Sequence, residues 1–301
     1  HNLAANAGME FWEMVWFGFL KILPLYLVSY IVGLGIEFAS AQLRGHEVNE
    51  GYLVTGLIIP LIIPVTTPLW MLTLAVAFAV IIGKEIFGGT GMNIWNPALL
   101  ARAFLFFAYP SHISGDEVWV AGVDGFSGAT PLAQTSEGLS SLHYSVSDMF
   151  FGFIPGSVGE TSTLAILLGA AILIYTGIGS WKIMLSTVAG GLVMGLIANL
   201  AAPSADCAMA IPAWYHLIMG GFAFGAVFMA TDPVTSAQTE SGKWIYGFLI
   251  GVLAVIIRLF NPGYPEGMML AILLMNTFAP LIDHIVVGRN IKRRLKRAKT
   301  V

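Results

Sequence analysis

The chain has 301 residues, of which 57% are hydrophobic and 10% are charged, with a mean hydropathy of +0.80 and a formal net charge of −3. Soluble domains average about 45–50% apolar and roughly 25% charged residues, so this composition excludes a water-soluble globule. The apolar stretches are continuous and lack the alternation of a barrel wall, which indicates an all-α polytopic membrane protein. A single cysteine, Cys207, excludes a disulfide framework and cannot by itself ligate an iron–sulfur cluster.

Roughly nine apolar segments follow one another along the chain. Several are shorter than the ~20 residues that a perpendicular membrane crossing requires. We expect one membrane domain over 1–301, and the start at His1 beside an apolar segment suggests that an N-terminal part is missing. The segments are near Met14–Ala39, Tyr52–Thr67, Leu69–Gly83, Pro97–Tyr109 (which predicts a half-helix), Ser162–Ile178, Ile183–Ala201, Pro212–Ala230, Trp244–Phe260 and Glu266–Val287.

Basic residues are concentrated at the end of the sequence, directly after the last apolar segment. Nucleic-acid binding is a poor explanation for such a cluster, whereas the positive-inside rule places residues 288–301 in the cytoplasm as a basic tail. Counting spans backwards then places the long segment 110–161 outside, and that segment contains no Lys or Arg. The basic residues of the tail are Arg289, Lys292, Arg293, Arg294, Lys296, Arg297 and Lys299.

Two stretches of the sequence match in order. Pro64-Val65-Thr66, Trp70, the Ala-Val-Ile-Ile at 79–82 and Lys84 correspond to Pro233-Val234-Thr235, Trp244, the Ala-Val-Ile-Ile at 254–257 and Arg258. Each copy ends in a Gly- or Pro-rich break followed by a helix that begins at or beside proline. An odd number of predicted spans separates the copies, so we expect inverted repeats with broken half-helices, an architecture typical of proteins that move ions or small solutes.

The predicted external segment 110–161 contains the motif Ser127-Gly128-Ala129-Thr130. Taken alone, this is an ordinary Gly-rich surface turn. It resembles the flavinylation sequence of two related families of redox pumps, in which the threonine hydroxyl is esterified by the phosphate of FMN. That chemistry needs a hydroxyl on an accessible turn with small neighbours. The modifying transferase works on the extracytoplasmic side, where the charge pattern independently places Thr130.

The whole chain resembles the B subunits of sodium-translocating NADH:quinone oxidoreductases. RNF-complex D subunits are a related alternative; Phe104–Pro110 and the basic tail favour the quinone-reducing family. A cofactor-free channel or secondary transporter is the rival that the repeat alone would support. Stretches that carry the resemblance are residues 46–51, 83–110 (GKEIFGGTGMNIWNPALLARAFLFFAYP), 155–157, 229–233, 265–276 (PEGMMLAILLMN) and 289–295.

The resemblance implies a multi-pass subunit of the bacterial inner membrane, with the C-terminus cytoplasmic and the Thr130 loop periplasmic. It implies covalent FMN on Thr130, noncovalent riboflavin, and electron transfer to ubiquinone coupled to sodium movement. The expected partners are other membrane and flavin or iron–sulfur subunits of the same complex, and no nucleic acid.

Asn93 and Asn96 flank the opening of the predicted half-helix. Asn96 is a good N-cap and Pro97 suits the first helical position. In the family this region lies at the riboflavin site, and asparagine amides suit the edge of an isoalloxazine ring, so the two roles can coexist. Arg102 lies within the half-helix and needs a partner, for which a flavin or a carboxylate would serve.

Acidic residues fall toward the predicted inner ends of several spans. Burying an ionised carboxylate in lipid is costly, and solvation at the interface or pairing with a basic residue is the alternative account, as for Glu85 with Lys84. Oxygen ligands suit a hard cation such as sodium. Asp283 is the best candidate for binding sodium, followed by Asp232 and Glu37.

Gly33 and Gly35 lie near the predicted inner end of the first span. Close helix packing is the default interpretation of such glycines. The family places quinone in this region, which implies that Gly33 and Gly35 contact it. Family members often have adjacent glycines, whereas here Leu34 separates the two.

Overall fold

The computed structural model describes residues 10–45, 47, 50–113, 129–137, 142–204, 206–261 and 266–298. Over these residues the secondary structure is helical and contains no strand, which confirms the all-α prediction. The helices are α1 (Phe11–Arg44), α2 (Tyr52–Ile62), α3 (Leu69–Gly83), η1 (Glu85–Phe87), α4 (Pro97–Ala108), α5 (Pro110–Ile113), α6 (Pro131–Glu137), α7 (Val146–Phe151), α8 (Thr163–Tyr175), α9 (Trp181–Ala201), η3 (Ala208–Ala210), α10 (Tyr215–Ile218), α11 (Phe222–Phe224), η4 (Gly225–Met229), α12 (Glu240–Phe260) and α13 (Met268–Ala298).

Five helices in the described part of the chain are long and apolar enough to cross a membrane: α1, α3 together with η1, α9, α12 and α13. Helices α2, α4 and α8 are apolar but shorter. Helix α4 matches the predicted half-helix, since it begins at Pro97 and has only 12 residues. The multi-pass architecture inferred from composition is therefore present.

The single span predicted over Pro212–Ala230 is instead broken. Helix α10 ends at Ile218, and the chain becomes helical again in α11 and in the π-helical turn η4. Gly220 has a φ of 59°, a left-handed conformation that ends a helix and that glycine adopts readily. Met219 and Phe222 on either side are fully buried, so protein rather than lipid surrounds this break.

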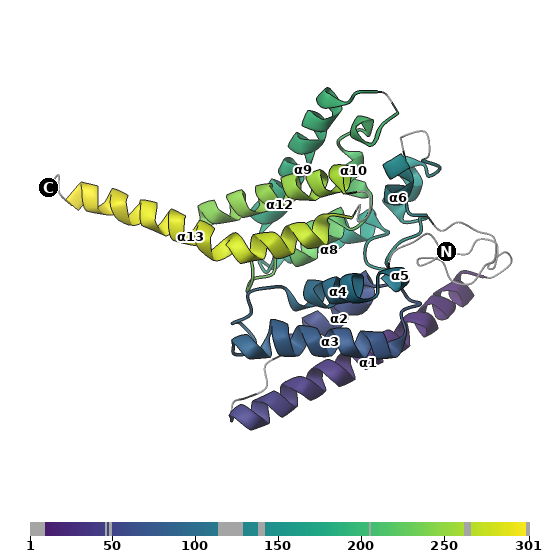
Figure 1. Ribbon diagram of the computed structural model, residues 1–301, viewed down its shortest axis with the longest axis horizontal. Helices are drawn as coiled ribbons and strands as arrows, with labels where there is room; N and C mark the ends of the chain where they lie inside the picture. Colours follow the sequence, from purple (N-terminus) through teal and green to yellow (C-terminus); the bar gives the residue numbers. More distant parts are fainter. Residues whose placement is uncertain are drawn as a thin grey trace.

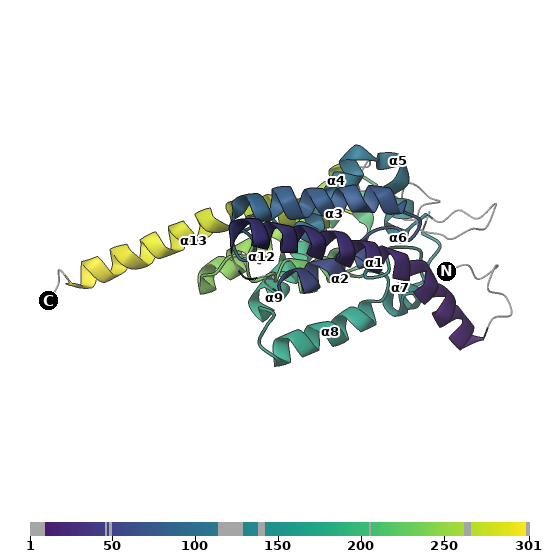
Figure 2. The ribbon, with the colours of Figure 1, turned by 90° about the horizontal axis from the view of Figure 1, so that it is seen from below.

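The elongated molecule has two distinct ends (Figures 1 and 2). We call the end toward which α13 runs the basic end, and the opposite end, where α6 lies, the α6 end. Ion pairs tie helix ends together at the basic end. Lys84 after α3 pairs with Glu37 of α1, and Lys182 of α9 pairs with Glu240 of α12.

The two copies of the sequence repeat have opposite orientations. Helix α3 runs toward the basic end and α12 runs away from it, and each is followed by an antiparallel partner, α4 or α13 (Figure 1). The partners contact each other reciprocally. Arg102 of α4 forms an ion pair with Glu266, which lies just before α13. In the other direction, the side-chain oxygen of Asn276 on α13 accepts a hydrogen bond at 3.1 Å from the backbone N–H of Asn96, which lies just before α4, once the Asn276 amide is oriented to suit its neighbours. This arrangement is that of an inverted repeat.

Candidate functional site

Thr130 immediately precedes α6. Its hydroxyl accepts a hydrogen bond from the Ala133 N–H at 3.1 Å, and its carbonyl accepts one from the Gln134 N–H at 3.0 Å. Gln134 also donates from Nε2 to the Ala129 carbonyl at 3.2 Å. Thr130 therefore caps the first turn of α6, half-buried, at the end of the molecule farthest from the basic tail (Figure 1). Ser127 and Gly128 lie outside the described residues.

Helix α6 packs onto the broken segment through Leu132, which is buried. A Cβ added to Gly220 would lie 3.1 Å from Leu132 Cδ2 and 3.5 Å from Arg258 Nη2. Arg258 in turn donates to the carbonyls of His216 at 2.6 Å and Met219 at 2.9 Å. Helix α6 therefore packs against a segment whose carbonyl groups are held by the buried guanidinium of Arg258.

Asn96 holds the opening of α4. Its side-chain oxygen accepts from the N–H groups of Ala98 at 3.0 Å and Leu99 at 3.2 Å, which confirms the predicted N-cap. Its amide nitrogen donates to Asp232 Oδ2 at 3.3 Å. The structure therefore brings a predicted flavin residue into contact with a predicted sodium residue, although the two are far apart in sequence.

Asp232 lies in the connection between η4 and α12. It accepts from Thr235 Oγ1 at 2.9 Å and from the Val234 N–H at 3.1 Å. Burial raises the pKa of Asp232 above its ordinary value, against the effect of its hydrogen bonds with Val234, Thr235 and Asn96. The ionisation of this carboxylate is therefore sensitive to any charge placed near Asn96.

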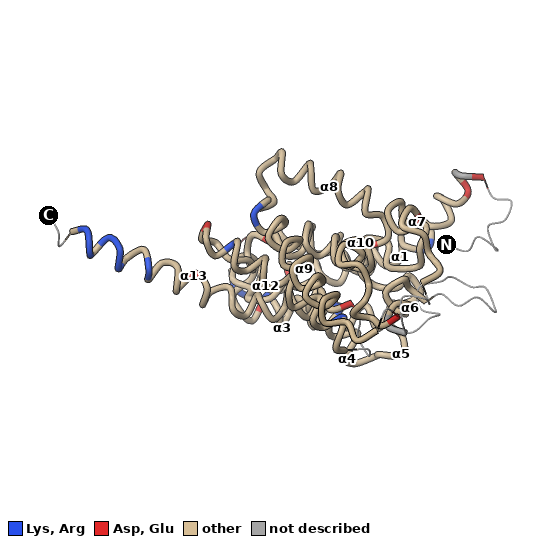
Figure 3. The backbone as a smooth tube through the Cα atoms, turned by 90° about the horizontal axis from the view of Figure 1, so that it is seen from above, with Lys and Arg blue, Asp and Glu red and all other residues tan. Residues whose placement is uncertain are grey.

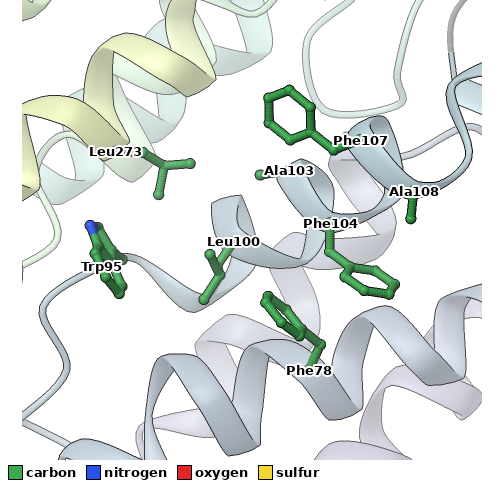
Figure 4. Close-up of a pocket in the computed structure, with 8 residues that line it drawn as sticks. All are labelled: Phe78, Trp95, Leu100, Ala103, Phe104, Phe107, Ala108 and Leu273. Atoms are coloured by element: carbon green, nitrogen blue, oxygen red, sulfur yellow. The ribbon is translucent and has the colours of Figure 1, made fainter.

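Asn93 is buried in the turn before α4 and donates from Nδ2 to the Trp95 carbonyl at 3.1 Å. The indole N–H of Trp95 donates to Thr277 Oγ1 of α13 at 2.9 Å. Trp95 also lines a pocket of about 560 Å³ between α3, α4 and α13 (Figure 4). The lining is almost entirely apolar and consists of Phe78, Trp95, Leu100, Ala103, Phe104, Phe107, Ala108 and Leu273.

Arg102 is buried in the middle of α4 and meets carboxylates, which was one of the two kinds of partner expected for it. It pairs with Glu266, and its Nη1 lies 4.0 Å from Glu160 Oε2. A small cavity of about 20 Å³ lies among these three side chains. Burial first, and then the negative charge of Glu266, raise the pKa of Glu160 to about 7, although Arg102 opposes the shift. Glu160 belongs to the connection between α7 and α8.

The other predicted site residues lie at the basic end, apart from one another. Glu37 is buried and paired with Lys84. Asp283 of α13 accepts from the N–H groups of Gln238 at 2.7 Å and Thr239 at 2.9 Å and from the Thr239 hydroxyl at 2.6 Å, which fixes the start of α12. In the described part of the chain, no three His, Cys, Asp or Glu side chains are grouped so as to hold a metal ion.

Gly33 and Gly35 differ in their surroundings. A Cβ on Gly33 would lie 1.9 Å from Tyr52 Cζ, whereas a Cβ on Gly35 would have no heavy atom within 4 Å. Tyr52 is fully buried and donates to the Ser29 carbonyl at 2.9 Å. Close packing is therefore the role of Gly33, and Gly35 faces outward from the described structure.

Sequence reasoning missed several polar residues of these clusters. Glu160 and Asn276 are buried among apolar residues, and Tyr246 lies 2.6 Å from the Asn276 amide. The sequence indicated Glu266 only as a helix start. A polar group inside an apolar segment is the available signal, because it must find a partner within the protein.

Comparison with known proteins assigns the chain to a family. A family model described as "NQR2, RnfD, RnfE family" matches residues 3–292. The chain is 54% identical over 289 residues to the B subunit of the Na(+)-translocating NADH-quinone reductase of Chromohalobacter salexigens, covering 95% of this chain and 70% of that protein. It is 52% identical to the protein of the same name from Ectopseudomonas mendocina and 51% identical to that from Azotobacter vinelandii, covering 98% and 97% of this chain and 74% of each relative. The chain therefore belongs to the NQR2, RnfD, RnfE family.

Proposed function

We propose that this chain is the flavin-carrying membrane subunit of a redox-driven sodium pump. Electrons would pass from FMN on Thr130, through riboflavin near Asn93 and Asn96, to ubiquinone. The general function, that of a subunit of a sodium-translocating NADH:quinone reductase, is supported by the shared name of relatives that match nearly the whole chain. The flavins would supply the electron chemistry, while the chain's residues hold and orient them.

The position of Thr130 carries the proposal. Helix α6, which Thr130 directly precedes, lies at the end of the molecule opposite the basic tail (Figures 1 and 3). The positive-inside rule assigns the basic end to the cytoplasm, so Thr130 would face the periplasm of a bacterial inner membrane. The Thr130 hydroxyl accepts a hydrogen bond from the Ala133 N–H. Leu132 of α6 packs against Gly220, which also lies next to Arg258.

A riboflavin site at Asn93 and Asn96 is supported by the adjoining pocket. Its volume of about 560 Å³ falls within the range of small-molecule sites, and its aromatic lining suits a planar ring. Trp95, which lies between the two asparagines in the sequence, lines this pocket (Figure 4). The Asn96 oxygen is already used by the helix cap, so Asn96 would offer a ring only an amide N–H, and Asn93 would supply other polar contacts.

The hydrogen bond between Asn96 and Asp232 supports coupling between electrons and sodium. Negative charge arriving beside Asn96 would favour a cation near the Asp232 carboxylate. On α1, Gly33 and Glu37 are one turn apart and lie on the same buried face, which Tyr52 covers at Gly33. A quinone at this end of α1 would therefore contact the outward-facing Gly35, on the opposite face of the helix from the Glu37–Lys84 ion pair. Asp283 Oδ1 accepts two hydrogen bonds from Thr239, whereas Oδ2 accepts one from Gln238, so Oδ2 is the oxygen that would bind sodium.

The relatives favour this proposal over its two rivals. Those compared are named for NADH-quinone reductase rather than for the RNF complex. Membership of a family named after redox-complex subunits also speaks against a cofactor-free channel or secondary transporter.

Denaturing electrophoresis with in-gel flavin fluorescence tests the attachment site. We expect Thr130→Val to abolish the fluorescent band and the FMN-sized increase in intact mass. Thr135→Val is the matched control, because Thr135 is the next threonine in α6 and its buried hydroxyl bonds only to the Leu132 carbonyl at 3.0 Å. A fluorescent Thr130→Val band, or a wild-type band without fluorescence, would refute the proposal.

A further inference from the structure

Helix α13 continues without interruption well past the rest of the molecule (Figures 1, 2 and 3). It has 31 residues, which at 1.5 Å per residue give a length of about 46 Å. A hydrocarbon core of ~30 Å accounts for about 20 of them, from Met268 to Val287. The part from Gly288 to Ala298, which we call the α13 extension, therefore projects by about 16 Å.

The α13 extension is amphipathic. Ile291 and Leu295 are spaced four apart and so form one stripe, which continues the line of Val287 at the end of the membrane-spanning part, and they are 52% and 57% exposed. Helical spacing places basic residues on the other faces, among them Arg289, Lys292, Arg293 and Arg294. The extension contains no Asp or Glu, and Lys and Arg recur along it (Figure 3). Its chemistry fits an apolar groove with acidic side chains at its rim.

The geometry favours a protein over a membrane surface as the partner. The headgroup layer adds only about 5–7 Å beyond the hydrocarbon core, or roughly four residues of helix. Leu295, the most exposed residue of the stripe, lies beyond that distance on a straight helix. To lie on the membrane, the extension would have to bend at Gly288, yet the helix is continuous there.

The extension also gains little stability from its own sequence. Arg289 and Arg293, Lys292 and Lys296, and Arg293 and Arg297 are like charges spaced four apart, which destabilise a helix. The extension continues a helix that is already formed, so contacts made by its side chains decide how much further stability it gains. A surface that covers the stripe and opposes the charge would stabilise it on both counts.

We propose that the α13 extension is a docking helix for an acid-rimmed apolar groove on a water-exposed part of another subunit of the same complex. Ile291 and Leu295 enter the groove, and the basic faces contact its rim. This inference rests on the proposed membership of a multi-subunit complex but not on the proposed flavin positions. Its failure would therefore not contradict the flavin positions.

Site-directed photo-cross-linking in the purified intact complex tests the proposal. Leu295→Cys and Arg293→Cys, each in a Cys207→Ser background, are labelled with benzophenone maleimide and illuminated. Arg293 is the matched control because it lies on the opposite face of the same turn. We expect a cross-link from position 295 to a partner polypeptide, at least roughly fivefold stronger than from position 293. Equal yields from the two positions, adducts with lipid alone, or no protein adduct would overturn the proposal.

A second measurement covers the case in which the labelled variants assemble poorly. Ile291→Ala combined with Leu295→Ala should release the partner subunit from the complex at a lower salt concentration than wild type does, whereas Asn290→Ala should not. Release of the partner at the same salt concentration in both variants would contradict the docking role.

Discussion

Replacing Arg102 by methionine tests the buried ion cluster at the centre of the inverted repeat. Arg102 and Glu160 are each 5% exposed, and Arg102 also pairs with Glu266. Breaking a buried ion pair by removing one partner typically destabilises a protein by about 3–5 kcal/mol, because the remaining charge is left uncompensated. We expect a loss of this size for Arg102→Met at pH 8.5, which lies above the Glu160 pKa of about 7.

The loss should depend on pH in a defined direction. Burial and the Glu266 charge raise the pKa of Glu160 to about 7, so Glu160 binds a proton in the folded state more readily than in the unfolded state. The stability associated with that proton is fully present below the unfolded pKa, near 4.5, and is lost as the pH rises through about 7. Without Arg102 the Glu160 pKa rises further, so the protonated carboxyl is favoured and the penalty shrinks by about 1.4 kcal/mol per pH unit at most as the pH falls.

Thermal unfolding of the detergent-solubilised protein at pH 6 and pH 8.5 measures both effects. Arg102→Met should lose clearly less stability at pH 6 than at pH 8.5, and adding Glu160→Gln should remove most of that difference. Arg258 donates to the Glu266 carbonyl and remains in all variants, which keeps the neighbouring charge constant. Equal losses at the two pH values would show that Glu160 does not respond to the loss of Arg102, and a pH dependence that survives Glu160→Gln would assign it to another group.

Three further predictions concern stability and are checked by the same unfolding assay. Gly33→Ala should cost about 1–3 kcal/mol because its Cβ would meet Tyr52, whereas Gly35→Ala should change stability by less than about 0.5 kcal/mol; similar losses at both positions would contradict this. Asn96→Ala should cost about 1 kcal/mol through loss of the α4 cap, with Asn96→Ser recovering most of it, and an unchanged midpoint for the alanine variant would exclude the cap. Asp283→Asn should weaken the start of α12 by about 1–3 kcal/mol because the Thr239 contacts lose a charged acceptor, and it should do so with or without sodium if the role is structural.

Hydropathy and proline placement predicted the main architecture correctly. The short apolar segment after Asn96-Pro97 is the half-helix α4, since an asparagine cap followed by proline at the first position specifies a helix start locally. The inverted orientation of the repeat followed from counting spans. Both inferences need only the local pattern and the rule that backbone groups in lipid must be satisfied within the protein.

The errors arose where distant residues decide the structure. The broken segment 212–230 is apolar along its length, and its break depends on the left-handed Gly220 packed beneath Leu132 of α6. The charge pattern predicted the position of the basic tail but not its conformation, and α13 continues through it as far as Ala298. The partners of Arg102 come from the connection before α8 and from the start of α13, and no spacing along the chain relates these positions.

The contact between the two half-repeats gives the candidate sites a mechanical relation. Arg102 on α4 pairs with Glu266 at the start of α13, and Asn276 on α13 accepts from the backbone at the start of α4. Neither helix can slide along the other without breaking both contacts. The Asn276 contact adjoins the hydrogen bond between Asn96 and Asp232. The Arg102 contact involves Glu266, whose carbonyl accepts a hydrogen bond from Arg258, and Arg258 lies next to the segment on which α6 packs. The α4–α13 pair therefore contacts both clusters, and it connects the neighbourhood of Asn96 with the segment on which α6 packs.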